Sequence, residues 1–205
     1  KKHFSVLTKE LSIDNVEYVW TQFISQLAII RIRLDLDALA AYKNDPAAKS
    51  LKEIYLAYPG FHAIAIYRLS RELLILNVPI IPGMMSEYAH GLTGTDIHPR
   101  ASIGDSFFID HATGVVIGET TIIKDNVTIY QGVTLGGIKV DKVLRDTKRH
   151  PTINNNVTIY ANATILGGEV IIGENSVIGA NVWITKTIPK NSIVTYKSEI
   201  KITNK

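Results

Sequence analysis

The segment IHPRASIGDSFFI, residues 97–109, carries an isoleucine at every sixth position, at Ile97, Ile103 and Ile109. A helix repeats about every 3.6 residues and a strand about every two, so neither produces this period. The spacing continues with small gaps to residue 184. Its further positions are Ile117, Ile123, Ile129, Leu135, Ile153, Ile159, Ile165, Ile172, Ile178 and Ile184.

A β-helix of short strands explains a period of six, because each side of its coil turns one branched apolar residue inward. Chance spacing in an ordinary β-sandwich is the alternative, and the constancy of residue type disfavours it. We therefore predict a hexapeptide-repeat solenoid over residues 96–188 and a C-terminal tail over residues 189–205. Because each coil buries its interior only against its neighbours, both ends of the stack need caps.

Residues 1–95 carry helical spacing and predict an α-helical N-terminal domain that can cap one end of the solenoid. Apolar side chains three or four apart begin at Val16, Val19 and Trp20, as one face of a helix requires. Asp45 before Pro46 has the pattern of an N-cap followed by a proline at the first helical position. The predicted fold class is therefore α+β.

The composition excludes several classes of protein. The 205 residues contain no cysteine and carry a formal net charge of +3 without a long basic run. These features exclude disulfides and Cys-ligated metals, and they indicate no nucleic-acid partner. No apolar run is long enough for a membrane helix, and the first residues lack a signal-peptide pattern. We expect a cytoplasmic protein whose start, at Lys1 rather than Met, is trimmed.

The solenoid contains one carboxylate and one imidazole that its geometry should bring together. Asp96 and His111 fall on what should be the same side of neighbouring coils, where a carboxylate can orient an imidazole. Such an imidazole can act as a general base. Alternatively, His111 is a corner residue bonded to the backbone, and Asp110 beside it is only a turn residue.

A charged insertion over residues 138–151 should extrude from the solenoid as a loop, and long loops are usually functional or disordered. It ends in Arg149 and His150. A guanidinium can grip a substrate carboxylate bidentately, and an imidazole can donate to an oxygen. A solvated basic loop end is the alternative. The remaining histidines, His3, His62, His90 and His98, have the pattern of structural or exposed residues.

Several motifs together resemble the serine O-acetyltransferase family. They are Asp96-Ile97-His98-Pro99, Asp110-His111-Ala112-Thr113-Gly114, Gly118-Glu119-Thr120, Val133-Thr134-Leu135-Gly136-Gly137 and Arg149-His150-Pro151. Asn44-Asp45-Pro46-Ala47 and Gly60-Phe61-His62-Ala63 resemble motifs of that family's helical domain. The resemblance spans roughly residues 35–195. The hexad period alone would indicate only a large acyltransferase superfamily.

This resemblance implies a left-handed parallel β-helix that transfers acetyl from acetyl-CoA to the hydroxyl of L-serine. The product, O-acetyl-L-serine, feeds cysteine biosynthesis. By motif, His111 is the general base and Asp96 its orienting carboxylate. The implied binding roles are Asp45 and Asp110 for the serine ammonium, Arg149 and His150 for its carboxylate, and Glu119 in support.

The resemblance also implies partners. Acetyl-CoA lies in a groove between neighbouring solenoids, where the matching candidates are Gly137, Ala161, Gly179 and Ala180. No metal is expected. Family members form homotrimers, often paired into hexamers as dimers of trimers through their helical domains, and cysteine is a feedback inhibitor.

Two departures from the family pattern affect these expectations. The loop over residues 138–148 is lysine-rich where many relatives carry a shorter glycine-rich loop. The chain ends Ile202-Thr203-Asn204-Lys205, without the terminal isoleucine that often inserts into O-acetylserine sulfhydrylase. We therefore expect association with that enzyme to be doubtful.

Three other functions fit the solenoid less well. A sugar acetyltransferase would not need the opposed charges of Asp45, Asp110 and Arg149, which suit a zwitterionic amino acid. A zinc hydratase resembling gamma-type carbonic anhydrases needs three histidines, including one pair four residues apart, and no two histidines here have that separation. A purely structural solenoid would leave the charged loop and the Asp–His pair without a role.

Overall fold

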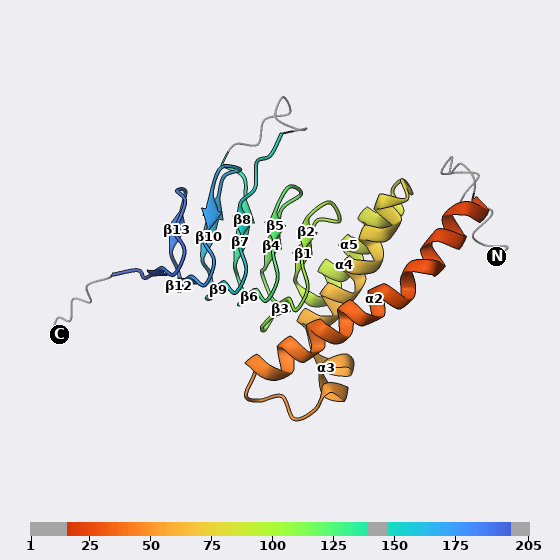
Figure 1. Cartoon of the computed structure of the whole chain (residues 1–205), viewed down its shortest axis with the longest axis horizontal. Coiled ribbons are helices and arrows are strands. Elements are labelled where there is room, and N and C mark those ends of the chain that lie inside the picture. Colours follow the sequence, from red (N-terminus) through yellow and green to blue (C-terminus); the bar gives the residue numbers. More distant parts are fainter. Residues whose placement is uncertain (1–15, 139–146, 198–205) are drawn as a thin grey trace, which may run out of the picture.

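The computed structural model describes residues 16–138 and 147–197, in which helices precede a stack of short parallel strands (Figure 1). The helices are α2 (Val16–Asn44), α3 (Leu51–Ala57), α4 (Pro59–Ile75) and α5 (Ile81–Thr93). Pro59 lies in the first turn of α4, and Gly94 closes α5 in the left-handed conformation, with φ +72°. Both positions follow the usual preference for proline at helix starts and glycine just past their ends.

The prediction that Asp45 caps a helix was wrong. Asp45 follows the end of α2, and its Oδ1 accepts a 2.8 Å hydrogen bond from the Ala47 N–H. The next helix, α3, begins only at Leu51, where the Ser50 side chain accepts from the Glu53 N–H. Ser50 and Glu53 have the spacing of a capping box, which is a stronger start signal than Asp45 with Pro46.

The strands form three parallel sheets that make the sides of a left-handed β-helix, as predicted. They are β1 (Asp96–Ile97), β2 (Ser102–Ile103), β3 (Phe108–Ile109), β4 (Val116–Ile117), β5 (Ile122–Ile123), β6 (Thr128–Ile129), β7 (Thr134–Gly136), β8 (Thr152–Ile153), β9 (Thr158–Ile159), β10 (Thr164–Leu166), β11 (Ile171–Ile172), β12 (Val177–Ile178), β13 (Trp183–Ile184) and β14 (Ile193–Val194). The sheet orders are β1-β4-β7-β10-β13, β11-β8-β5-β2 and β14-β12-β9-β6-β3.

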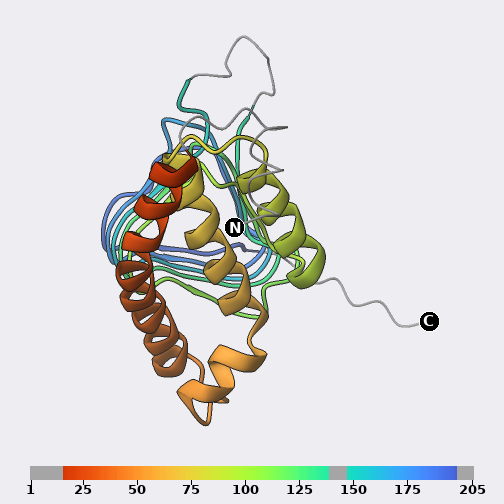
Figure 2. The same ribbon diagram turned by 90° about the vertical axis from the view of Figure 1, so that its right-hand side faces the viewer.

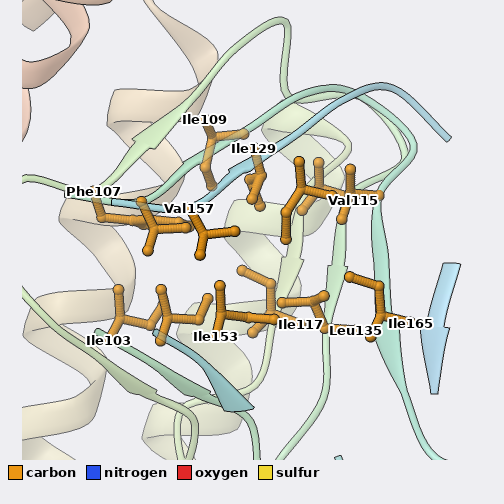
Figure 3. Packing of buried hydrophobic residues seen from close by; sticks show 14 of the residues in the cluster. Ile103, Phe107, Ile109, Val115, Ile117, Ile129, Leu135, Ile153, Val157 and Ile165 are labelled. Atoms are coloured by element: carbon orange, nitrogen blue, oxygen red, sulfur yellow. The ribbon is translucent and has the colours of Figure 1, made fainter. Parts of the chain in front are cut away.

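The residues that define the six-residue period stack in register inside the coils. Ile97 pairs with Ile117, which pairs with Leu135. Every one of the thirteen predicted inward positions is between 0% and 6% exposed. Figure 3 shows part of this interior, where inward residues such as Ile117 and Leu135 lie with Phe107 and Val157. The prediction of the core from the period is confirmed.

The helices cover one open end of the solenoid, as Figures 1 and 2 both show. Ala63, Ile64 and Tyr67 of α4 belong to the same buried cluster as Ile97 and the other inward residues. The first coil therefore buries its open side against α4, as a solenoid end requires.

The solenoid extends further toward the C-terminus than expected. The first strand begins at Asp96, directly after the end of α5. At the other end, β14 pairs with β12, so the last coil runs to Val194, beyond residue 188. Residues 139–146 of the charged loop and 198–205 of the tail lie outside the described residues. None of the described helices combines the length and apolarity that a membrane span needs.

Candidate active site

His111 lies in the turn between β3 and β4, at one corner of the solenoid. Its backbone and that of Ala112 take positive φ angles of 58° and 67°, an uncommon conformation that turns the chain sharply. The His111 Nε2 lies 3.7 Å from Asp110 Oδ2, and the His111 side chain is 69% exposed. The corner therefore presents an accessible imidazole beside a carboxylate.

Helices α2, α3 and α4 bring a second carboxylate to this corner. Phe108 of β3 packs in a buried cluster with Ala38, Ala41 and Ile54, against which Tyr58 also packs. The Tyr58 hydroxyl donates a 2.5 Å hydrogen bond to Asp45 Oδ2. The helices therefore hold Asp45 near Asp110, although the two residues are far apart in sequence.

Gly60 makes this close docking possible. A side-chain carbon at Gly60 would overlap the carbonyl oxygen of Ile109, the residue just before Asp110. Since glycine lacks that carbon, the start of α4 can lie directly on the end of β3. This contact explains why a glycine precedes Phe61 and His62 in the motif noted above.

Asp45 lies close enough to Asp110 for the two charges to interact. Burial raises the pKa of the Asp110 carboxyl, with Asp45 adding to the rise and His111 opposing it. The hydrogen bond to Asp45 is the first cause, and burial the second, that raises the pKa of Tyr58 to about 12. Two carboxylates beside one exposed imidazole form a site that favours a cation.

A second cluster lies at the next corner, in the turn between β4 and β5. Glu119 forms ion pairs with Arg149 and, at 3.4 Å, with Arg100. The Arg149 and Glu119 side chains are only 22% and 24% exposed. A half-buried guanidinium held by a carboxylate suits recognition of a further carboxylate.

His150 sits in the same cluster against Thr120. Its Nδ1 accepts a 3.1 Å hydrogen bond from the Thr120 N–H and lies 2.8 Å from Thr120 Oγ1. Burial, followed by Arg149 and Lys148, lowers the pKa of His150 to about 4. The imidazole is therefore neutral near neutral pH.

The two clusters occupy different corners of one chain, because Asp110 and His111 precede β4 whereas Glu119 and Thr120 follow it. Within the described part of the chain, the ion-pair contact of His111 is with Asp110 and not with Asp96. Asp96 pairs with Val116 as the first residue of β1. It lies on the segment beside His111, since the Thr95 hydroxyl donates to the Ala112 carbonyl at 3.1 Å.

Three of the residues expected to bind acetyl-CoA lie farther along the solenoid, on the same edge as Asp110. Ala161 follows β9, and Gly179 and Ala180 follow β12, in the same sheet as β3. Gly137 follows β7 and lies on the other edge, with Glu119. On the first edge Tyr130 and Tyr160 stack, with ring centroids 4.9 Å apart.

Two contributors to these clusters, Tyr58 and Thr120, were not expected from the sequence. Tyr58 gave no signal, because its partner Asp45 is recognisable only after α3 and α4 have folded back. Thr120 stood within a motif, but no role followed from its type. Of the histidines expected to be structural, His62 Nε2 lies 3.2 Å from the Tyr55 carbonyl oxygen and His98 Nδ1 accepts from the Arg100 N–H. Over residues 16–138 and 147–197 no group of three metal-ligating side chains is found.

Comparison with curated proteins finds close relatives of this chain. A serine acetyltransferase of Synechococcus elongatus is 46% identical over 178 residues, which cover 84% of this chain and 56% of the relative. The chain spans about half the length of the first curated relatives it matches. No protein-family model matches the chain.

Solved structures agree with this finding. The serine acetyltransferase isoform 3 of Entamoeba histolytica, in complex with cysteine, superposes with a TM-score of 0.86 at 40% identity, covering 98% of this chain and 73% of that one. The serine acetyltransferase of Neisseria gonorrhoeae, in complex with serine, has a TM-score of 0.78 at 33% identity, covering 88% and 72%.

Proposed function

Because the chain belongs to the serine acetyltransferase family, we propose that it transfers acetyl from acetyl-CoA to the hydroxyl of L-serine. The observation that carries this proposal is the opposed charge of the two clusters. Asp45 and Asp110 form one, and Arg149 with the neutral donor His150 forms the other. An amino acid, with its ammonium and carboxylate, matches both; a neutral sugar matches neither.

The proposed reaction begins with proton transfer to His111. As the imidazole takes the proton of the serine hydroxyl, the hydroxyl oxygen attacks the thioester carbonyl carbon directly. The carbon–sulfur bond breaks, and the thiolate of CoA receives the proton from the imidazolium. Asp96 is proposed to orient the imidazole, and Asp110 lies close enough to stabilise its charged form.

We propose that the complete site forms between neighbouring chains of a homotrimer. The sheet β1-β4-β7-β10-β13 separates the two clusters, and its outer side chains include Trp183, which is 70% exposed. Packing of this sheet against a second copy would bring the His111 corner of one chain to the Arg149 corner of the next. Acetyl-CoA would then lie along Ala161, Gly179 and Ala180, with Gly137 contributed from the other edge.

Cysteine is expected to compete with serine at this site. It carries the same ammonium and carboxylate, so the clusters that bind serine also fit cysteine. The Entamoeba relative in complex with cysteine supports this expectation.

Thiol release from acetyl-CoA tests the proposal, with L-serine, D-serine, homoserine and a galactoside as acceptors. Release with L-serine that is lost in His111→Ala supports both the reaction and its base. Release with the galactoside would instead indicate a sugar acetyltransferase. Undiminished thiol release by His111→Ala would mean that His111 is not the base.

A further inference from the structure

We propose that Thr120 fixes His150 as a neutral imidazole with its proton on Nε2, so that His150 is a hydrogen-bond donor and not a base. The identity of the ligand that receives this bond, the serine carboxylate, rests on the proposed function. The protonation and tautomer of His150 do not, because they follow from contacts within the chain.

The hydrogen bonds around the Thr120 hydroxyl leave one arrangement. A hydroxyl accepts two hydrogen bonds and donates one. Thr120 Oγ1 accepts from the N–H of Arg149 at 2.9 Å and from the N–H of His150 at 3.0 Å. Both of its acceptor positions are used, so its proton is donated to His150 Nδ1 at 2.8 Å.

His150 Nδ1 therefore receives the hydroxyl proton as well as the Thr120 N–H, which lies at 3.1 Å. A ring nitrogen that accepts hydrogen bonds carries no proton of its own, and a neutral imidazole must then carry its proton on the other nitrogen. Nε2 is consequently the donor. A proton on Nδ1 would point at the two hydrogens that Thr120 already donates to that nitrogen. This repulsion disfavours the charged form of the His150 imidazole.

The ring is also fixed in position. A side-chain carbon on Gly118 would overlap the Cδ2 and Nε2 atoms of His150, so the imidazole lies directly against this glycine. The charged and titratable groups around the ring are Lys148 and Arg149 from its own loop, Glu119 from the turn after β4, and His98 from the turn after β1. The two cations outnumber Glu119 and disfavour a charged ring.

Two imidazoles in the proposed site thus have different tasks. His111 is exposed beside Asp110 and can accept a proton. His150 has one nitrogen occupied as an acceptor and the other already protonated, so it can only donate. Of Arg149 and His150, Arg149 is then the charged residue. Thr120 acts as a positioning residue for both, because their backbone N–H groups donate to its hydroxyl.

Imidazole nitrogen NMR of the full chain labelled with ¹⁵N-histidine tests the proposal without any substrate. The His150 signals are identified as those lost in His150→Gln. The expected result is a single Nε2–H tautomer that stays neutral from about pH 8 to pH 5. A proton on Nδ1, or a titration near the ordinary histidine pKa, would overturn the proposal.

Variants then locate the cause in the Thr120 hydroxyl. In Thr120→Val we expect mixed tautomers, a pKa raised by about one unit or more, and a KM for L-serine raised about tenfold with less change in kcat. Thr120→Ser should restore the wild-type values. Thr121→Val is the matched control, since within the described residues the Thr121 hydroxyl has no hydrogen-bond partner.

The two proposals fail in distinguishable ways. A wild-type protein with the Nε2–H tautomer but no acetyl transfer to serine would contradict the proposed function alone. Normal serine kinetics and a wild-type His150 spectrum in Thr120→Val would contradict the role of Thr120 alone.

Discussion

Tyr58 donates a 2.5 Å hydrogen bond to Asp45 across thirteen residues of chain, and this bond joins the start of α4 to the segment after α2. Both residues lie over the corner that holds Asp110, as the electrostatic effect of Asp110 on Tyr58 shows. The acidic cluster of Asp45 and Asp110 is therefore built partly by the helices and partly by the solenoid. Its function should respond to changes in either part.

Replacing His111 by alanine should lower kcat by about 10²–10⁴-fold, the usual contribution of general acid–base catalysis. The exposed position of His111 means that the free energy of unfolding should hardly change. Thiol-release kinetics and urea unfolding measure the two effects. Asp96→Asn and Asp110→Asn, compared side by side, show which carboxylate supports the imidazole; a variant at Asp96 with full activity would contradict its orienting role.

Replacing Asp45 by asparagine should raise the KM for L-serine about 10- to 100-fold, because the hydrogen bond to the ammonium loses its charged acceptor. Tyr58→Phe should have a smaller effect in the same direction, since the carboxylate stays but loses its anchor. The matched controls are Asp35→Asn and Tyr55→Phe, which break a similar 2.7 Å bond outside the site. Equal effects in both pairs would mean that only helix packing was disturbed.

Replacing Gly60 by alanine should destabilise the protein by about 1–3 kcal/mol, the usual cost of overpacking. The new side chain would meet the Ile109 carbonyl and push α4 away from β3, so the KM for serine should also rise. Gly91→Ala in α5 is the control, because its side chain would enter open space. That change should be neutral or stabilise by up to about 1 kcal/mol. Thermal unfolding of Gly60→Ala and Gly91→Ala measures the two changes in stability.

Replacing Arg68 by methionine should destabilise the protein by about 3–5 kcal/mol, because it leaves a buried carboxylate without its partner. Arg68 binds Asp37 through two hydrogen bonds of 2.6 and 2.8 Å, and their side chains are 2% and 0% exposed. Arg68 also donates to the Gly104 carbonyl. The double change with Asp37→Leu should recover part of the loss. An unchanged urea midpoint in Arg68→Met would contradict the role of this pair.

The free energy of unfolding should fall as the pH drops from about 6.5 toward 4, in part because of His150. Burial lowers the pKa of His150 to about 4, whereas the ordinary value is 6.5. Between these values the unfolded chain binds a proton that the folded chain does not, so acidification favours unfolding. His150→Gln should reduce this slope, measured by urea unfolding at several pH values.

Much of the fold could be predicted because its rule is local and repeated. Each inward isoleucine meets an equivalent residue of the next coil, so the six-residue period defines the core without knowledge of distant contacts. The predicted helix cap at Asp45 was wrong because the local signals conflicted. Two start signals competed within a few residues, and the capping box of Ser50 and Glu53 prevailed.

The sequence motifs proposed members for the candidate site but not their contacts. The motifs named Asp45, Asp110, His111, Arg149 and His150, and the structure places them at two corners of the solenoid. The contact of His111 with Asp110 depends on the sharp turn at His111 and Ala112. The group that anchors Asp45 depended on helices packing over β3, and no period encodes that pairing.

The sequence by itself determined the solenoid, its helical beginning and the residue types available for chemistry. Only the tertiary structure decided that Tyr58 holds Asp45, that Glu119 holds Arg149, and that Thr120 holds His150 through Nδ1. The physical reason is that burial of apolar side chains is repeated and non-directional, so a pattern reveals it. Hydrogen bonds and ion pairs are directional and depend on the distance between particular atoms.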